Sequence, residues 1–544
     1  SSRLTRVSHQ YDNNPSVLLL EHTYDELGRL QTDKLDNGIY ATDYAYNIRN
    51  WLTGIEGGKF SQSLHYTDGL GVPCYNGNIS SMTWKSGAGA TPRGYKFSYD
   101  RLGRLTDAEY GEGPSLSVNT NRFNEQVTGY DKMGNILGLK RYGQTSATGY
   151  DVIDDLSLSY AGNRLKKVAD RSGTSAFNNG FEFKDGIDLP TEYEYDENGN
   201  LTKDLNKKKT AIQYNCLNLP SRVMFANGNS ISYLYDAAGR KLRTVHVLEG
   251  DSVTTDYCGN VVYENGVPQI LLTEVGYVSL TDGQYHYYLK DHQGNNRVVV
   301  DEEGAVEEVN DYYAFGGLMS TSSRQSVQPY KYNGKELDRK GGLDWYDYGA
   351  RMYDAALGRF MKTDRFSEKY VSLSPYQYGA NNPVNNIDVN GDNVYVSGEF
   401  SGGRKFNDIA VGEFDSPQEF LNSPYNSYGA SDDMSINTYG FSEGYMIPTS
   451  KEQDDIIRDT FISISKNESY DFLGNNCSTV VQKSLEAAGI ITFTQKSTRH
   501  RISSSHYLGE SSFIATISTS RPVIPSVSFR AIIKNNPQGK MIYR

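Results

Sequence analysis

Apolar and polar residues alternate in short runs along the first three hundred residues, and each run ends at a turn that contains glycine. The stretch "YEYDENGNL" (Tyr193–Leu201) shows the pattern: aromatic residues alternate with acids, a turn follows, and an apolar residue begins the next run. A period of two predicts half-buried strands, while Asp bonds nearby backbone and Gly accepts positive φ in tight turns. This part of the chain is therefore predicted to form successive β-hairpins.

The same turn recurs with the same order of residue types: an aromatic residue, Asp, two variable residues, Gly, Arg or Asn, and an apolar residue. One hairpin cannot bury its own face, so the copies must stack side by side. The clear copies are Tyr24–Leu30, Tyr99–Leu105, Tyr130–Ile136, Tyr195–Leu201 and Tyr235–Leu242, and weaker ones lie at Tyr160–Leu165 and Lys290–Val298.

Composition supports a globular chain of several domains that is rich in tyrosine. The 544 residues include 43 Tyr but only 20 Phe and 3 Trp, and the net charge of −12 argues against a general nucleic-acid binder. We find no apolar run of eighteen residues, no signal-peptide core and no zinc-like cysteine spacing, so we expect no membrane span, metal or cofactor. Because the first residues already lie inside the repeat, we expect the chain to be a fragment of a longer one.

These turns are similar to the YD repeats of the Rhs/YD-repeat family, and the resemblance covers residues 1–300. It implies a mainly β fold in which the hairpins form a closed shell. Residues 301–392 resemble the Rhs-associated core, through Tyr312–Met319, Tyr330–Phe366 and Ser374–Asp392. In the family this core plugs one end of the shell and cuts the chain after an Asp-Pro-x-Gly element, which releases a variable C-terminal toxin.

Such a cut requires two neighbouring carboxylates, because carboxylates held close cannot both ionise and can then divide the acid and base roles. The resemblance points to Asp364 and Asp388 as this pair, to Arg359 as the group that tunes their charge, and to cleavage near Asp392. The alternative is that Asp364 and Asp388 are turn residues that accept backbone N–H groups.

Three positions depart from the family pattern around this predicted cut. Arg365 follows Asp364 where the family usually has Pro, and Val389 replaces the Pro of Asp-Pro-x-Gly. Asp392 follows Gly391 where a cleaved member typically has Leu. These departures leave open whether the chain is processed here.

The composition changes after Gly391, and residues 393–544 are predicted to form a small α+β domain. Helices are expected over Ser450–Lys466 and from Cys477 to Ala488, since apolar residues recur there with a helical period. Cys477 then lies at a helix N-terminus, where the helix dipole favours the thiolate that a nucleophile needs. The alternative is a cysteine buried at the start of a core helix.

The stretch "YDFLGNNCSTVVQKSLEAAGI" (Tyr470–Ile490) resembles the active-site helix of the permuted papain-like superfamily, which includes NlpC-type peptidases and lecithin:retinol acyltransferase-like enzymes. The resemblance implies a thiolate at Cys477, oxyanion stabilisation by its amide and by Asn475 or Asn476, and a His base. Asp408 occupies the expected His position. Either the enzyme is inactive, or His506 serves as the base; His500 is the other His of this domain.

The leading hypothesis is a polymorphic toxin in which the shell encloses a cysteine hydrolase or acyltransferase used in bacterial competition. The resemblance implies secretion or delivery into a target cell, an immunity protein, a secretion apparatus, and a substrate with a peptide, amide or acyl bond. Two alternatives stay open. One is a non-enzymatic surface or secreted protein whose exposed tyrosines bind carbohydrate or a partner, and the other is a toxin whose basic tail (521–544) contacts nucleic acid.

Overall fold

The computed structural model divides the chain into two compact units, Thr5–Ser401 and a unit of Ser1–Leu4 with Gly402–Arg544. It describes residues 3–392 except 12–14, 88–89, 324–327 and 370–371, and after residue 393 it describes only short strands. The strand β32 (Val394–Val396) belongs to the first unit. The described strands of the second are β33 (Val411–Gly412), β34 (Ser427–Tyr428), β35 (Glu443–Met446), β36 (Ile502–Ser505), β37 (Ala515–Ile517) and β38 (Lys540–Tyr543).

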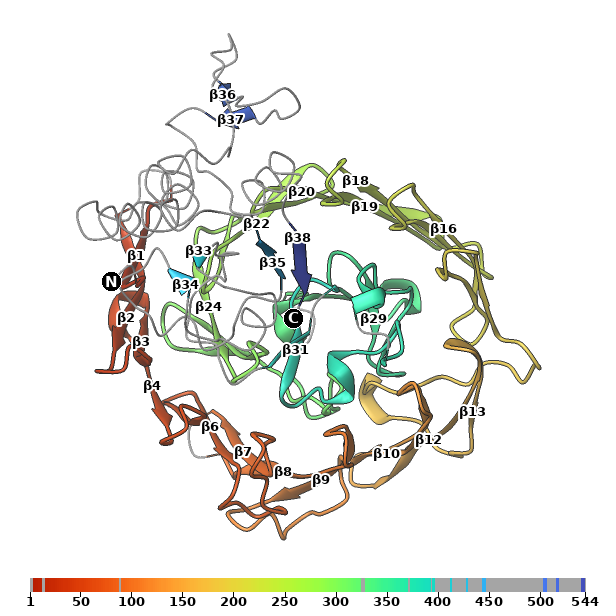
Figure 1. Cartoon of the computed structure of the whole chain (residues 1–544), viewed down its shortest axis with the longest axis horizontal. Coiled ribbons are helices and arrows are strands. Elements are labelled where there is room, and N and C mark those ends of the chain that lie inside the picture. The colour runs from red at the N-terminus through yellow and green to blue at the C-terminus, as the bar shows by residue number, and fades with distance from the viewer. Residues whose placement is uncertain are drawn as a thin grey trace. The chain divides into compact units, whose positions relative to one another are not determined.

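The described part of the first unit is built mainly from two thirteen-stranded antiparallel sheets, so the predicted mainly β fold is confirmed. In each sheet every strand pairs with the next strand along the chain (Figure 1), as expected for hairpins in series. The first sheet contains β1 (Arg6–His9), β2 (Val17–Tyr24), β3 (Leu30–Leu35), β4 (Tyr40–Tyr46), β5 (Leu52–Gly57), β6 (Phe60–His65), β7 (Ser81–Ser86), β8 (Arg93–Tyr99), β9 (Leu105–Glu112), β10 (Glu125–Tyr130), β11 (Ile136–Gln144), β12 (Tyr150–Ala161) and β13 (Arg164–Asp170).

The second sheet continues the same meander through shorter strands. It contains β14 (Tyr193–Tyr195), β15 (Leu201–Asp204), β16 (Lys209–Tyr214), β17 (Pro220–Phe225), β18 (Ser230–Tyr235), β19 (Lys241–Leu248), β20 (Asp251–Cys258), β21 (Val261–Glu264), β22 (Val267–Leu272), β23 (Gly276–Ser279), β24 (Tyr285–Lys290), β25 (Asn296–Asp301) and β26 (Val306–Val309). Single 3₁₀ turns link some elements: η1 (Asp36–Gly38), η2 (Phe177–Asn179), η3 (Tyr332–Gly334), η4 (Lys340–Gly342), η5 (Ser367–Lys369) and η6 (Gly379–Asn381).

Each polar residue of the repeated turn has a defined task, which the turn at Asp100 illustrates. One carboxylate oxygen of Asp100 accepts the backbone N–H groups of Leu102 at 2.9 Å and Arg104 at 3.0 Å, and the other accepts Nε of Arg104 at 2.7 Å. Gly103 takes the positive φ of +76° that the turn requires. The Arg104 guanidinium lies 4.3 Å above the ring of Tyr130 in the next hairpin, so the turn also contacts its neighbour.

In several repeats the tyrosine links its hairpin to an earlier one. The Tyr130 hydroxyl donates to the carbonyl of Leu105 at 2.6 Å, and Leu105 is the buried apolar residue that follows the preceding turn. The chain therefore selects Tyr over Phe because a phenol both fills the core and satisfies a backbone carbonyl. The same link joins Tyr46 to Leu30, Tyr66 to Leu52, Tyr99 to Ile79, Tyr160 to Ile136 and Tyr214 to Leu201.

The two sheets contact each other at both ends of the meander, which closes the shell within this unit (Figure 1). At one end, His9 lies 2.9 Å from the Tyr285 hydroxyl, and the Tyr40 hydroxyl donates to the carbonyl of Asp301 at 2.5 Å. At the other end, the backbone N–H of Glu192 donates to the carbonyl of Lys166 at 2.9 Å.

The segment after β26 turns away from the sheets and packs against their inner faces. It contains a sheet of four short strands, β27 (Glu336–Asp338), β28 (Trp345–Asp347), β29 (Met352–Asp354) and β30 (Arg359–Phe360), and then β31 (Asn386–Asp388), which pairs with β32. Its core is aromatic, because Tyr332, Tyr346, Tyr348, Tyr353 and Tyr378 are all at most 1% exposed.

We call the segment after β26, residues 310–392, the plug. A buried ion cluster anchors it to the first sheet. Arg141 on β11 bonds Glu125 at 2.6 Å and Asp154 at 2.8 Å, and all three side chains are fully buried. Arg141 also donates to the carbonyl of Ala355, and the second oxygen of Glu125 accepts the N–H of Phe315, each at 2.8 Å. The charges of the shell thus satisfy backbone groups of the plug.

Candidate functional site

Arg351 brings two of the predicted cleavage residues together in the interior. Its guanidinium is 2% exposed and lies 3.8 Å from the Phe360 ring centroid. One nitrogen, Nη2, lies 2.9 Å from Oδ2 of Asp364 and 3.1 Å from Oδ2 of Asp388. The two carboxylates predicted to act as a pair therefore converge on a single donor.

Asp388 also shapes the turn that joins β31 to β32. Its other oxygen, Oδ1, accepts the backbone N–H groups of Gly391 at 2.7 Å and Asp392 at 3.1 Å. Nε of Arg351 donates to the carbonyl of Gly391, so one arginine holds both the carboxylate and the turn. Gly391 has φ +81°, and a Cβ there would lie 2.8 Å from the backbone nitrogen of Arg351. No other residue fits this turn without displacing Arg351.

The two carboxylate oxygens of Asp364 also have separate partners. Oδ1 accepts the N–H of Phe366 at 2.7 Å, while Oδ2 faces Arg351. Its backbone N–H donates to the carbonyl of Pro375 at 2.9 Å, and Nη1 of Arg351 donates to the same carbonyl at 3.1 Å. Each aspartate thus caps a local turn with one oxygen and meets the shared arginine with the other.

Burial dominates the electrostatics of this cluster. It lowers the pKa of the Arg351 guanidinium, an effect that the charges of Asp364, Asp388 and Asp392 oppose. Burial raises the pKa of Asp392, although Arg365 and Arg351 counteract the shift. Burial also lowers the pKa of Lys362, a neighbouring amine, to about 8.

The structure places Arg359, the arginine expected to tune the pair, in a different set of contacts. Its Nη2 donates to the carbonyl of Asn163 at 3.0 Å, and its guanidinium lies over the rings of Tyr160 and Tyr376 at 5.1 Å and 4.8 Å. Arg351 takes the position between the two carboxylates. Both arginines belong to the stretch that resembles the Rhs core; Arg351 lies in the turn between β28 and β29, whereas Arg359 begins β30.

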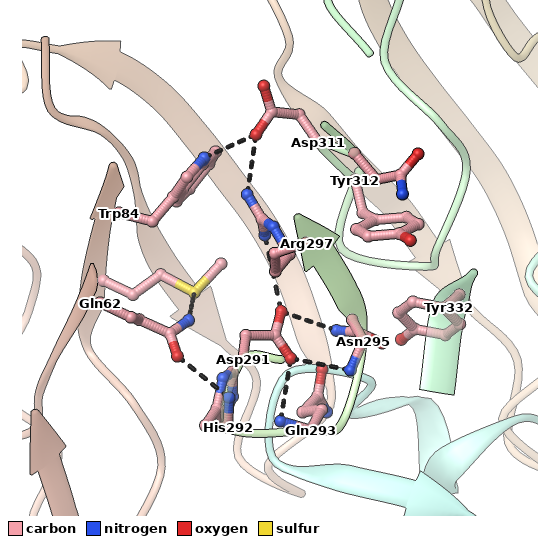
Figure 2. Close-up of polar contacts among 12 residues, drawn as sticks. Gln62, Trp84, Asp291, His292, Gln293, Asn295, Arg297, Asp311, Tyr312 and Tyr332 are labelled. Carbon is pink, nitrogen blue, oxygen red and sulfur yellow. Dashed lines mark hydrogen bonds and ion pairs between the residues drawn. The ribbon is translucent and has the colours of Figure 1, made fainter. Parts of the chain in front are cut away.

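The buried turn between β24 and β25, whose side chains are drawn in Figure 2, also contacts the segment that leads into β31. Nε2 of His292 lies 3.0 Å from the carbonyl of Val384, and Nε2 of Gln293 donates to the carbonyls of Pro383 at 2.5 Å and Asn386 at 3.3 Å. This turn is the weaker YD copy at Lys290–Val298. Unlike the surface copies, it is buried, and it fixes the backbone just before Asp388.

Arg297 and Asp311 join this turn to the first sheet. Arg297 lies 3.5 Å from Asp291, 2.8 Å from Oδ1 of Asp311 and 4.7 Å from the centroid of a Trp84 ring. The indole N–H of Trp84 donates to the same Asp311 oxygen at 2.7 Å, as Figure 2 shows. The two arginines that face Asp311, Arg297 and Arg93, lower its pKa despite its burial. The sequence analysis did not predict this network. The feature that could have indicated it is the variant repeat "DHQGNNR" (residues 291–297).

The predicted nucleophile and its partners lie outside the described residues. These are Cys477, Asn475, Asn476, Asp408, His500 and His506. Within the part of the chain that the structure describes, no group of His, Cys, Asp and Glu side chains is arranged to hold a metal ion. None of the helices described there is long and apolar enough to cross a membrane.

Comparison with known proteins identifies the shell. The family described as "Teneurin YD-shell" matches residues 74–384, which is more than half of the chain. The chain belongs to the YD-shell family. The match ends eight residues before Asp392, so it includes Arg351 and Asp364 but not the turn after β31.

Relatives of this YD-shell protein are much longer than it is. Salivary gland surface protein 1 of Aedes aegypti is 30% identical over 223 residues, which are 36% of this chain and 6% of that protein. The tRNA3(Ser)-specific nuclease WapA of Bacillus spizizenii is 26% identical over 406 residues, or 69% of this chain and 15% of that protein. The chain thus spans a small part of the length of both.

One solved structure, described as TcdB2-TccC3-Cdc42, is similar to 70% of this YD-shell chain and to 22% of its own chain, with a TM-score of 0.44 and 16% identity.

Proposed function

We propose that this YD-shell protein is a toxin-like effector that carries the segment after residue 392 and frees it by cutting its own chain at the β31–β32 turn. The observation that carries the proposal is the convergence of Asp364 and Asp388 on Arg351 beside that turn. Membership of the YD-shell family and the similarity to WapA, which is named as a nuclease, support the toxin class.

The cut would be a hydrolysis with divided roles for the two aspartates. One carboxylate accepts a proton from a water molecule that adds to the carbonyl carbon of Asp392. The other, protonated, gives its proton to the nitrogen of Asn393 as the C–N bond breaks. Arg351 holds the turn through Gly391 and keeps both carboxylates in place. The products are a new carboxylate at residue 392 and a free amine at residue 393.

The released segment is proposed to be the toxic part. The resemblance of Tyr470–Ile490 to papain-like enzymes favours thiolate attack by Cys477, with an oxyanion held by its amide and by Asn475 or Asn476. The base would be His506, unless Asp408 marks an inactive form. An immunity protein, a secretion apparatus and a substrate with a peptide, amide or acyl bond belong to this proposal, as does delivery into a target cell.

The surface of the shell gives little support to the carbohydrate-binding alternative. Among the described tyrosines, Tyr75 alone has an exposed side chain, and the others are buried or half-buried. Several of their hydroxyls instead bond backbone carbonyls within the shell, as the Tyr130 hydroxyl does. Stacking on sugars needs aromatic faces that are open to solvent.

Cleavage is tested on the full chain synthesised in a cell-free system and followed by gel and mass spectrometry. We expect the chain to break after residue 392, and Asp364→Asn or Asp388→Asn to prevent the break. Asp25→Asn is the matched control, because Asp25 caps a surface turn in the same way. A wild-type chain that stays intact from pH 5 to 8 would rule out the self-cleavage proposal.

The chemistry of the released segment is tested with a thiol-reactive probe and with expression in bacteria. We expect Cys477 to react far faster than Cys74, Cys216 and Cys258, and Cys477→Ala to relieve any toxicity of the full chain. Equal and slow labelling of all four cysteines would remove the thiolate mechanism. It would leave other toxin chemistries, including nuclease activity like that named for WapA.

A further inference from the structure

Two of the three departures from the family pattern are partners in the structure. Arg365 stands where the resemblance predicts Pro, and Asp392 stands where it predicts Leu. Nη2 of Arg365 forms an ion pair with Oδ2 of Asp392, across 27 positions of sequence. The Asp392 side chain is 2% exposed and that of Arg365 is 64% exposed, so an exposed cation covers a buried anion.

A buried carboxylate is costly unless a counter-charge and hydrogen bonds compensate its lost hydration. The contact of Arg365 with Asp392 is electrostatic, since no donor among the described residues reaches Oδ2 of Asp392 with hydrogen-bonding geometry. Arg351 and Lys362 add positive charge to its surroundings, whereas Asp364 adds negative charge. Arg365 is the cation in direct contact, and its removal would leave Asp392 buried beside Asp364 without that contact.

We propose that Arg365 is a specificity-determining residue that seats an acidic side chain at position 392, immediately before the bond that is cut. The inference rests on the proposed self-cleavage. Arg365 takes no part in the proton transfers, which belong to Asp364 and Asp388. Its role is to neutralise the residue that supplies the attacked carbonyl, so that this carbonyl stays beside the two aspartates. Cleavage can thus follow an Asp at position 392. A shell that lacks a cation at position 365 would need an apolar residue at position 392 instead.

The test measures the first-order rate of cleavage of the full chain after cell-free synthesis, between pH 5 and 8. Two variants are compared with the wild type, Arg365→Leu and the double variant Arg365→Leu with Asp392→Leu. Thermal unfolding of non-cleaving Asp388→Asn versions of each verifies that the shell is folded.

We expect Arg365→Leu to slow cleavage about tenfold or more at pH 7.5, because the buried carboxylate has lost its counter-ion. The rate should recover as the pH falls, because burial raises the pKa of Asp392 and so favours its neutral form. The double variant should regain most of the wild-type rate at every pH, since Leu needs no counter-charge. This recovery distinguishes charge compensation from a general structural role of Arg365.

Two results would overturn the inference while leaving self-cleavage intact. One is a wild-type rate for Arg365→Leu at every pH, and the other is a double variant that is as slow as Arg365→Leu. An intact wild-type chain overturns the proposed function, and the specificity of Arg365 falls with it.

Discussion

Arg351 and Asp388 bond at 3.1 Å in the interior of the plug, although 37 positions of sequence separate them. Arg351 lies in the turn between β28 and β29, and Asp388 is the last residue of β31. The bond therefore joins two hairpin turns. Through it, the arginine that carries the charge also fixes the backbone at Gly391. The placement of the two carboxylates and the local fold of the turn therefore depend on the same side chain.

Replacement of Arg351 by Gln should therefore affect both stability and cleavage. The change leaves Asp364 and Asp388 buried without their cation, which costs about 3–5 kcal/mol of unfolding free energy for a buried pair. We expect a lower midpoint in urea denaturation and no cleavage. The control is Arg240→Gln, because the Arg240 side chain is 82% exposed and forms an ion pair with the local Asp236, so its loss should change stability by less than about 1 kcal/mol.

Gly391→Ala tests the close approach of the turn to Arg351. A Cβ at this position would lie 2.8 Å from the backbone nitrogen of Arg351, in addition to the strain of φ +81°. Gly250→Ala is the matched control, since Gly250 has φ +98° with no atom near the added Cβ. We expect both variants to lose stability, Gly391→Ala by at least about 1 kcal/mol more. Equal losses in thermal unfolding would contradict the close packing.

The repeat predicts a measurable role for the tyrosine hydroxyls. Tyr130→Phe removes the donor to the carbonyl of Leu105 and keeps the ring, so it should cost about 1 kcal/mol or slightly more. Tyr75→Phe should have no effect within error, because Tyr75 is 70% exposed. Urea denaturation of both variants measures the difference, and an unaltered Tyr130→Phe variant would show that packing alone sets the choice of Tyr.

The ion cluster around Arg141 predicts a pH dependence of stability. Burial raises the pKa of Asp154 to about 7, with Arg141 opposing the shift and Asp170 adding to it. Because the folded pKa lies above the unfolded one near 4, the contribution of Asp154 is fully present below pH 4 and is lost as the pH rises through 7. The contribution of Asp154 to the free energy of unfolding therefore falls between pH 5 and pH 8.

This dependence is measured as the change in the urea midpoint between pH 5 and pH 8. Asp154→Asn should make that change smaller, because the amide does not titrate. Asp155→Asn is the control on the same strand, where the side chain is 36% exposed and faces Arg171 at 3.9 Å, and it should keep the wild-type dependence. An Asp154→Asn variant with the full wild-type dependence would assign the effect to other groups.

The hairpins were predictable because the residues that form each turn are close together in the sequence. Asp100, Gly103 and Arg104 satisfy one another within five residues, and this chemistry is visible in the sequence without any knowledge of the fold. The predicted pairing of Asp364 with Asp388 rested on resemblance, and the structure brings both to one nitrogen. The roles of Cys477 and His506 stay predictions.

The identity of the arginine was not predictable in the same way. Arg351 and Arg359 are eight residues apart in a segment of two- and three-residue strands, and a change of one residue in strand register exchanges the faces of all side chains. The partners of Asp311 come from β7, β8 and β25, so sequence spacing gives no sign of them. Long-range packing, not local propensity, determines both sites.

The link from each tyrosine to the carbonyl of an earlier hairpin also bears on how such shells change in size. Tyr130 needs only a hairpin on one side that ends in an apolar residue such as Leu105, and Tyr160 finds the same in Ile136. A whole repeat can therefore be gained or lost without breaking the pattern, whereas half a repeat cannot. Genetic duplication could thus enlarge the shell in complete units while the plug and the cluster around Arg351 stay unchanged.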